Sequence, residues 1–333
     1  MRGAGRGAWR PARRVLLPVL MAVAGPAAAD SMRYCDGPAA LDAHQQDGLL
    51  RVAALVQEML EPSGVEVALI ARSGLRLEWL GERHSHAGLA LRDHRDGRWT
   101  VRQLYYACDE RRPRLFDQGL AGFVMGTAQP DRGHYELLLL DGADGRAVAR
   151  AALDDRRALG LLSADYSANA YAWSTRYQNC NQWVAELLGE AWAAPAGAPD
   201  AVAVTAAAAG DVSGAIGGAT TDPVAERRAR AQAALRQAGY VPRTVELGWL
   251  PLMWVASVWP WLHTDDLPAA QWDARALQVS MPSALSAWVE RRPSPPRRLA
   301  LCHRDRQVVI RSGGAPLDAD CTPADGDRVL QLD

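Results

Sequence analysis

The sequence predicts an α+β fold in which an antiparallel sheet packs on helices, followed by a C-terminal helical and β-hairpin extension. Two observations predict this class. Apolar residues recur at helical spacing in some segments and form short strand-like runs in others. Several of the strand-like runs follow one another with turn residues between them, which is typical of antiparallel pairing. The chain of 333 residues is long enough for one large domain or two ordinary ones.

The N-terminus has the pattern of a secretory signal peptide. Five arginines precede the apolar run VLLPVLMAVAG and the small residues PAAAD. We therefore expect cleavage after Ala29, which removes residues 1–29 and places the protein in the periplasm or outside the cell. Because five arginines and no acids are lost, the formal net charge falls from -1 to about -6. A mildly acidic chain is a poor candidate for nucleic-acid binding, and no later stretch predicts a membrane span.

The elements of the first half follow in order. Residues 40–60 are predicted as a helix with apolar residues at helical spacing, ended by a Pro-Ser-Gly sequence. Strands are predicted next, with a turn at DHRDGR between the second and the third. After them come a short helix, another strand, a helical stretch and the polar, aromatic segment SADYSANAYAWSTRYQ. The ranges are 65–72, 85–91 and 98–106 for the three strands, 114–126 for the short helix, 134–140 for the fourth strand and 145–162 for the helical stretch.

The second half begins with a helix that starts near Cys180. An Ala/Gly-rich linker, residues 196–222, separates a predicted core domain, residues 30–195, from an extension, residues 223–333. In the extension, residues 224–239 and 282–292 are predicted as helices, and the chain closes with a hairpin. The uncharged segment 247–262 contains four tryptophans and predicts a buried helix, with contact to a membrane interface or a partner as the alternative.

The chain has five cysteines, which in an oxidising compartment tend to pair. Cys302 and Cys321 flank the predicted hairpin and are expected to form a disulfide. Cys35 and Cys108 are then the natural second pair, although four cysteines allow three connectivities. On this count Cys180 is left unpaired.

Cys180 is predicted to lie in the first turn of a helix that Asn179 caps. The helix dipole and the free N–H groups of that turn stabilise an anion, so we expect a lowered thiol pKa. His84 and His86 stand two apart at the start of a predicted strand and therefore point to one face. Alternatively, Cys180 is a structural residue and the two histidines are an exposed strand end.

The histidine strand followed by the cysteine helix resembles circularly permuted papain-like thiol hydrolases of the NlpC-type superfamily, which includes the lecithin–retinol-acyltransferase-like branch. The matching residues are His86 in SHAG and Cys180 in NCN, and the resemblance covers roughly residues 60–190. It implies a permuted papain-like core. Nearly the whole mature chain also resembles a bacterial exported family known as domain of unknown function 2145, through YQNCNQWVAE and the closing CHR…DADC…GD segment.

The papain-like resemblance implies a third polar residue, on the next strand, that orients the imidazole. Gln103 is the choice because its amide oxygen can accept a hydrogen bond from the ring, with Thr100 as the rival. Arg102 points to the opposite face if the strand is regular. The oxyanion site would use the Cys180 backbone N–H and one further donor, for which Tyr171 and Tyr177 are the candidates.

The resemblance further implies an exported thiol-dependent hydrolase or acyl transferase that acts on an amide or ester. Cys180 would attack the carbonyl while His86 moves the proton. Peptidoglycan peptides or lipid acyl groups are the expected substrates, and we expect no cofactor and no metal. The sequence HTDD at residues 263–266 predicts a polar helix end rather than a metal site. The alternative function is a non-catalytic envelope binding or assembly protein on the same scaffold.

Overall fold

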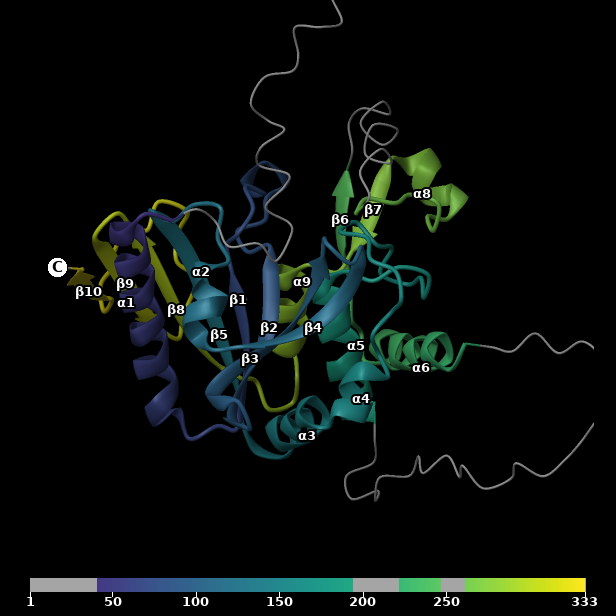
Figure 1. Ribbon diagram of the computed structural model, residues 1–333, viewed down its shortest axis with the longest axis horizontal. Coiled ribbons are helices and arrows are strands. Elements are labelled where there is room, and N and C mark those ends of the chain that lie inside the picture. The colour runs from purple at the N-terminus through teal and green to yellow at the C-terminus, as the bar shows by residue number, and fades with distance from the viewer. Residues whose placement is uncertain (1–40, 194–221, 247–260, 333) are drawn as a thin grey trace, which may run out of the picture. The chain divides into compact units, whose positions relative to one another are not determined.

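The structure is a computed structural model that describes residues 41–193, 222–246 and 261–332. The protein has a mixed α+β fold with a large antiparallel sheet, as the sequence predicts. The sheet has eight strands in the order β10-β9-β8-β5-β1-β2-β3-β4 (Figure 1). The strands are β1 Val67–Arg72, β2 His86–His94, β3 Gly97–Ala107, β4 Arg112–Gln118, β5 Arg132–Leu140, β8 Arg297–Arg304, β9 Gln307–Ser312 and β10 Arg328–Gln331.

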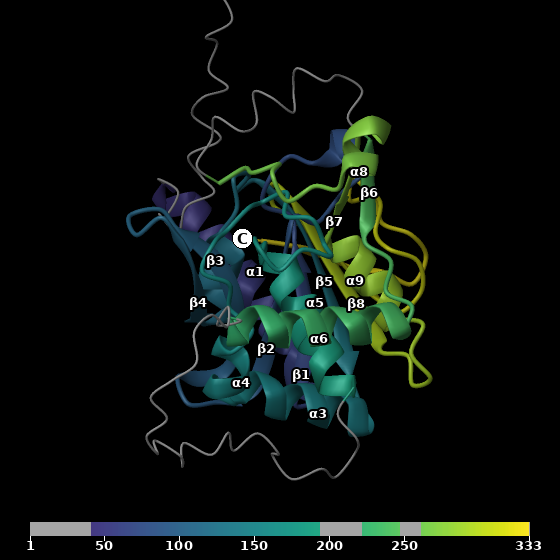
Figure 2. The same cartoon turned by 90° about the vertical axis from the view of Figure 1, so that its right-hand side faces the viewer.

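Helices cover both faces of this sheet, and a separate two-stranded sheet joins β6 to β7 (Figures 1 and 2). The helices are α1 Ala43–Leu60, α2 Leu120–Met125, α3 Gly142–Leu153, α4 Asp155–Leu159, α5 Cys180–Ala193, α6 Pro223–Gln237, α8 Ala269–Ala274 and α9 Pro282–Val289, and the two short strands are β6 Arg243–Glu246 and β7 Ala276–Val279.

Helices α1 and α2 pack on one face of the sheet. A capping box begins α1, in which the Asp42 carboxylate accepts from the backbone of Gln45 and the Gln45 side chain accepts from the backbone of Asp42. The apolar side of α1 then packs with α2 against alternate strand residues, among them Ile70, Ala90 and Val101. The side chains of β1, β2 and β3 that share this parity therefore face α2.

Helices α3 and α5 pack against the other face, where α5 contacts β2 and β3. Helix α6 lies against α5 (Figure 2). Strand β8 pairs with β5 along its length. The hairpin that the sequence assigns to a C-terminal extension thus lies in the same sheet as the strands of the first half.

The helix predicted for residues 114–126 is wrong in part. Residues 114–126 were expected to be helical, but β4 extends to Gln118 and only Leu120–Met125 are helical. The segment RPRLFDQ pairs with β3, so sheet hydrogen bonding decides its conformation. The predicted signal peptide, Cys35, and nearly all of both the linker and the tryptophan-rich segment lie outside the described residues.

Candidate functional site

Cys180 is the first residue of α5, and Asn179 caps the helix as the sequence predicts. The Asn179 side-chain oxygen accepts from the Gln182 backbone N–H at 2.7 Å, while its amide donates to the backbone oxygens of Ala168 and Ser280. The cap therefore also ties the start of α5 to two other segments. Cys180 is the free cysteine of the described residues, and it is buried.

The expected lowering of the Cys180 pKa is wrong for the structure as it stands. Burial raises the pKa of the thiol to about 12, although the backbone N–H groups of Asn181 and Cys180 and the charge of Arg72 act in the opposite direction. A helix N-terminus stabilises an anion by up to about 1 kcal/mol. The free-energy cost of removing a thiolate from water is larger than this, so burial decides the direction of the pKa shift. The resting thiol is consequently neutral at physiological pH.

His86 is the first residue of β2, and its ring is fixed by Gln103. The Nε2 atom lies 2.8 Å from Oε1 of Gln103, whose amide nitrogen donates to Gln118 at 2.8 Å. Because an amide oxygen only accepts, Nε2 carries the ring proton and Nδ1 is left to accept one. Tyr105 stacks on the ring with centroids 4.5 Å apart. Burial, with the charge of Arg72, lowers the pKa of His86 to about 3.

The contacts around Gly88 explain why a glycine stands two positions after His86 in SHAG. A Cβ atom at Gly88 would lie 2.8 Å from Val101 Cγ1 and 3.2 Å from Gln103 Cβ. A larger residue would therefore push Gln103 away from the imidazole, so the glycine is part of the hydrogen-bonding arrangement.

The segments that carry Cys180 and His86 meet at the start of β2, and they belong to opposite faces of the sheet. His86 shares the parity of Ala90 and lies near Phe123 of α2, whereas Cys180 begins the helix on the other face. The next residue, Asn181, donates to the backbone oxygen of Ser85 at 3.3 Å, which holds the two segments together. Among the described residues, the Cys180 sulfur makes no hydrogen bond to the ring of His86.

The rival residues have other contacts. The Thr100 hydroxyl donates to Gly97 at the strand start, on the face away from His86. The Tyr177 hydroxyl donates to Asp265 at 3.3 Å, and the Tyr171 backbone N–H donates to Asp266. These contacts attach the polar segment before α5 to the HTDD sequence.

A buried ion pair fixes the segment that carries Cys180. Glu186 of α5 and Arg228 of α6 are both fully buried and lie 2.9 Å apart. Gln178, Gln182 and Gln232 donate to the same carboxylate. Gln178, Gln182 and Glu186 of YQNCNQWVAE thus belong to a buried polar cluster that holds α5 against α6, a role that the sequence pattern did not reveal.

Arg72, the last residue of β1, was not singled out from the sequence. It is the direct cross-strand partner of His86 and is itself buried. Its Nη2 donates to the Tyr105 hydroxyl at 2.6 Å, and its guanidinium lies 5.3 Å from the Phe123 ring centroid. The sequence feature that could have identified Arg72 is a cationic residue at the end of the otherwise apolar strand VALIAR.

One cluster has the composition of a metal site. His94, Asp96 and Asp117 bring ligand atoms within 4.8 Å of one another. However, Nη2 of Arg102 lies 2.7 Å from the Asp117 carboxylate and 3.2 Å from His94 Nε2. A fixed guanidinium therefore occupies the place where a cation would bind. Arg102 lies on the face opposite to Gln103, as predicted.

The cysteines flanking the hairpin are joined. The structure contains the Cys302–Cys321 disulfide, with Cα atoms 5.8 Å apart. Cys108 is also disulfide-bonded. Disulfides of this kind are typical of proteins in oxidising compartments outside the cytoplasm.

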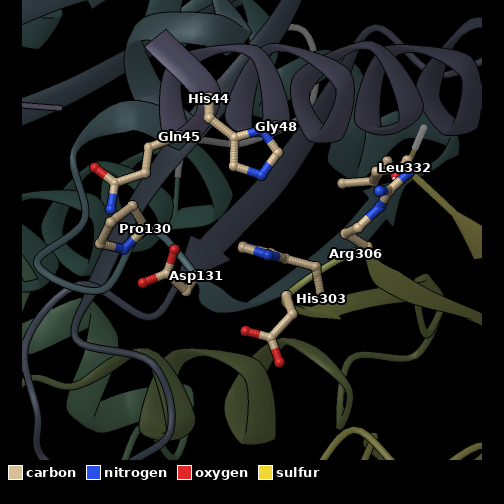
Figure 3. A pocket seen from close by; sticks show the side chains of 9 residues that line it. His44, Gln45, Gly48, Pro130, Asp131, His303, Arg306 and Leu332 are labelled. Carbon is tan, nitrogen blue, oxygen red and sulfur yellow. The ribbon is translucent and has the colours of Figure 1, made fainter. Parts of the chain in front are cut away.

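A small pocket lies away from these residues, between α1 and the β8–β9 turn (Figure 3). None of the predicted catalytic residues lines it. The Arg306 side chain at its edge is already bonded to the Leu332 backbone oxygen at 2.7 Å. Its lining residues are His44, Gln45, Gly48, Pro130, Asp131, His303, Asp305, Arg306 and Leu332.

Within the described ranges, no helix combines the length and the apolar character that crossing a membrane requires. A family model described as "Uncharacterized protein conserved in bacteria (DUF2145)" matches residues 59–289, which is more than half of the chain. Comparisons with curated proteins and with solved structures found no match.

Proposed function

The chain belongs to this bacterial DUF2145 family, and we propose that it is an exported thiol-dependent hydrolase or acyl transferase with a permuted papain-like core. The observation that carries the proposal is the arrangement of residues at the start of β2. A cysteine at a capped helix start and a histidine with a fixed tautomer lie on segments joined by the Asn181–Ser85 hydrogen bond. Nucleophile, base and orienting residue are the three parts that acyl transfer needs.

The proposed reaction starts from the neutral thiol. Nδ1 of His86 takes the Cys180 proton as the sulfur attacks the carbonyl carbon. The carbon–oxygen or carbon–nitrogen bond of the substrate then breaks, the imidazolium returns its proton to the leaving group, and a thioester remains on Cys180. Water or an acceptor hydroxyl or amine cleaves the thioester and releases the thiol. The Cys180 and Asn181 backbone N–H groups, which point toward the sulfur, are placed to support developing negative charge.

This mechanism requires a movement. The His86 ring and the Cys180 thiol must come into hydrogen-bond contact, and binding of substrate at the start of β2 would have to supply the free energy for that change. Substrate-induced completion of a catalytic site is a known behaviour of enzymes, and hydrogen bonds between catalytic groups are often long before substrate binds.

A second function is favoured by a specific observation. A buried, neutral thiol without a hydrogen bond to the imidazole also fits a non-catalytic binding or assembly protein that retains the scaffold. On that reading Cys180 is a packing residue and Gln103 stabilises a buried polar ring.

A direct test uses p-nitrophenyl acetate as the acyl donor. If the thiol is nucleophilic, intact-mass and peptide mapping will show an acetyl group on Cys180, together with a burst of nitrophenolate. His86→Ala should lower the burst rate by about 100-fold or more, the range of general-base catalysis. His84→Ala is the matched control and should retain the burst. An unmodified Cys180, or equal acylation of the His86 variant and the wild type, would favour the binding protein instead.

A further inference from the structure

Arg72 is a buried cation that has no carboxylate partner among the described residues. The described residues contain three buried arginines, Arg72, Arg102 and Arg228. Arg102 pairs with Asp117 at 2.7 Å, and Arg228 pairs with Glu186 at 2.9 Å. Within the described part of the chain, no carboxylate lies within ion-pair distance of Arg72. An unpaired buried charge is costly, so it points to an anion that the described residues do not supply.

The guanidinium retains donors for such an anion. An arginine has five N–H bonds. Nη1 donates to the Ser73 backbone oxygen at 3.3 Å and Nη2 donates to the Tyr105 hydroxyl, while Nε has no partner in the described residues. Because the Tyr105 oxygen accepts from Arg72, its own O–H remains free to donate. The two side chains therefore offer a guanidinium and a hydroxyl at one place.

The surroundings hold this cation in position. A Cβ atom at Gly74 would lie 2.3 Å from Nη1, and one at Gly126 would lie 2.4 Å from Nη2. The two glycines thus leave the space that the guanidinium fills, and Phe123 lies beneath it. A side chain that is packed this closely and has no counter-charge in the described part of the chain is preorganised for binding rather than for structural pairing.

We propose that Arg72 and Tyr105 form a binding site for a single carboxylate group of a ligand, at the end of β1 beside His86. One unpaired charge in a buried setting matches a monoanion better than a phosphate dianion, which would leave excess negative charge desolvated. A planar carboxylate also matches the fork of N–H donors on a guanidinium. The site stands whether or not Cys180 reacts, so loss of the acylation activity would leave this proposal intact.

The test compares N-acetylglycine with N-acetylglycinamide, which differ by the carboxylate alone. Thermal unfolding of the full mature protein is measured at constant ionic strength and pH 7.5. We expect the acid to raise Tm with increasing concentration and the amide to have no effect. Arg72→Gln should abolish the rise, and Arg72→Lys should reduce it because the planar fork is lost. Arg92→Gln is the matched control. Arg92 lies on β2, on the same face of the sheet as Arg72, and its guanidinium lies over Trp99. This variant should keep the response to the acid.

Equal stabilisation by acid and amide, or a full response in Arg72→Gln, would overturn the site. Stabilisation by inorganic phosphate that exceeds that of the acid and depends on Arg72 would overturn the carboxylate assignment. A second measurement needs no ligand. Removing an unpaired buried charge should leave the stability of Arg72→Met equal to or above that of the wild type, whereas Arg102→Met should be destabilised because it leaves Asp117 unpaired. Comparable losses in both variants would identify Arg72 as a structural residue.

Discussion

The imidazole of His86 and the amide of Gln103 lie on neighbouring strands with Nε2 and Oε1 2.8 Å apart. The contact is diagonal, because the ladder pairs Leu89 with Arg102 and therefore sets Gly88 opposite Gln103. The absence of a side chain at Gly88 is what allows this diagonal approach. The hydrogen bond, the glycine and the strand register thus form one unit.

Changing the charge of the orienting residue should change the titration of His86. In Gln103→Glu a carboxylate replaces the amide and favours the imidazolium, so the pKa of His86 should rise above the wild-type value. In Gln103→Leu the ring loses its acceptor, and the fraction of the Nε2-protonated tautomer should fall toward that of a free histidine. Nitrogen chemical shifts of the histidine ring measure both effects. Thr100→Val, on the same strand but the other face, should leave the His86 signals in place; a shift there would implicate the rival residue.

The Cys180 thiol should react slowly in the native protein. Burial raises its pKa to about 12, so at pH 7.5 iodoacetamide should alkylate it more slowly than the same cysteine in guanidinium chloride. The native rate should keep rising with pH through pH 10, while the denatured rate levels off above about pH 8.5, the ordinary thiol pKa. A plateau between pH 6 and 7 would instead reveal a thiolate–imidazolium pair and would contradict the resting geometry.

Mild acid should destabilise the fold through buried histidines. Burial lowers the pKa of His86 to about 3 and that of His303 to about 4, so the unfolded state binds more protons below about pH 6.5. The free energy of unfolding should therefore fall as pH drops from about 6.5 toward 4, by up to about 1.4 kcal/mol per pH unit for each histidine. Denaturant titrations at several pH values measure this slope. His303→Asn should flatten it and His44→Asn, at an exposed position, should not; a slope near zero in the wild type would contradict the prediction.

The Glu186–Arg228 pair should dominate the attachment of α6. Arg228→Met leaves a buried carboxylate unpaired and should lower the free energy of unfolding by about 3–5 kcal/mol. Arg230→Met is the control on the same helix, because its pair with Glu226 is exposed and should matter by about 0.5 kcal/mol or less. Adding Glu186→Leu to Arg228→Met should recover part of the loss. If both single variants of α6 unfold alike in denaturant, the pair does not have the strength we assign to it.

Much of the local structure could be predicted from the sequence. The capping preference of asparagine located the α5 cap at Asn179, and strand parity separated Gln103 from Arg102. The helical interpretation of residues 114–126 failed because pairing with β3 outweighed local propensity.

The missed features depend on contacts distant in sequence. Glu186 and Arg228 are bonded to each other although they lie 42 positions apart in the sequence. Arg72 and Tyr105 are likewise bonded and lie 33 positions apart. Patterns within a window of one element contain no information about such partners. The pKa of Cys180 was misjudged for the same reason, since burial is a property of the assembled core.

The pairing of β5 with β8 has a consequence for how the chain can be made. Strand β5 ends at Leu140 and its neighbour β8 begins at Arg297, so the sheet gains its last three strands only when the end of the chain is present. A chain that stops before Arg297 would leave β5 as an open edge, with the apolar run LLLL at its end. C-terminal truncation should therefore yield aggregated material rather than a smaller working domain, and proteolysis would be most damaging before the final strands have paired.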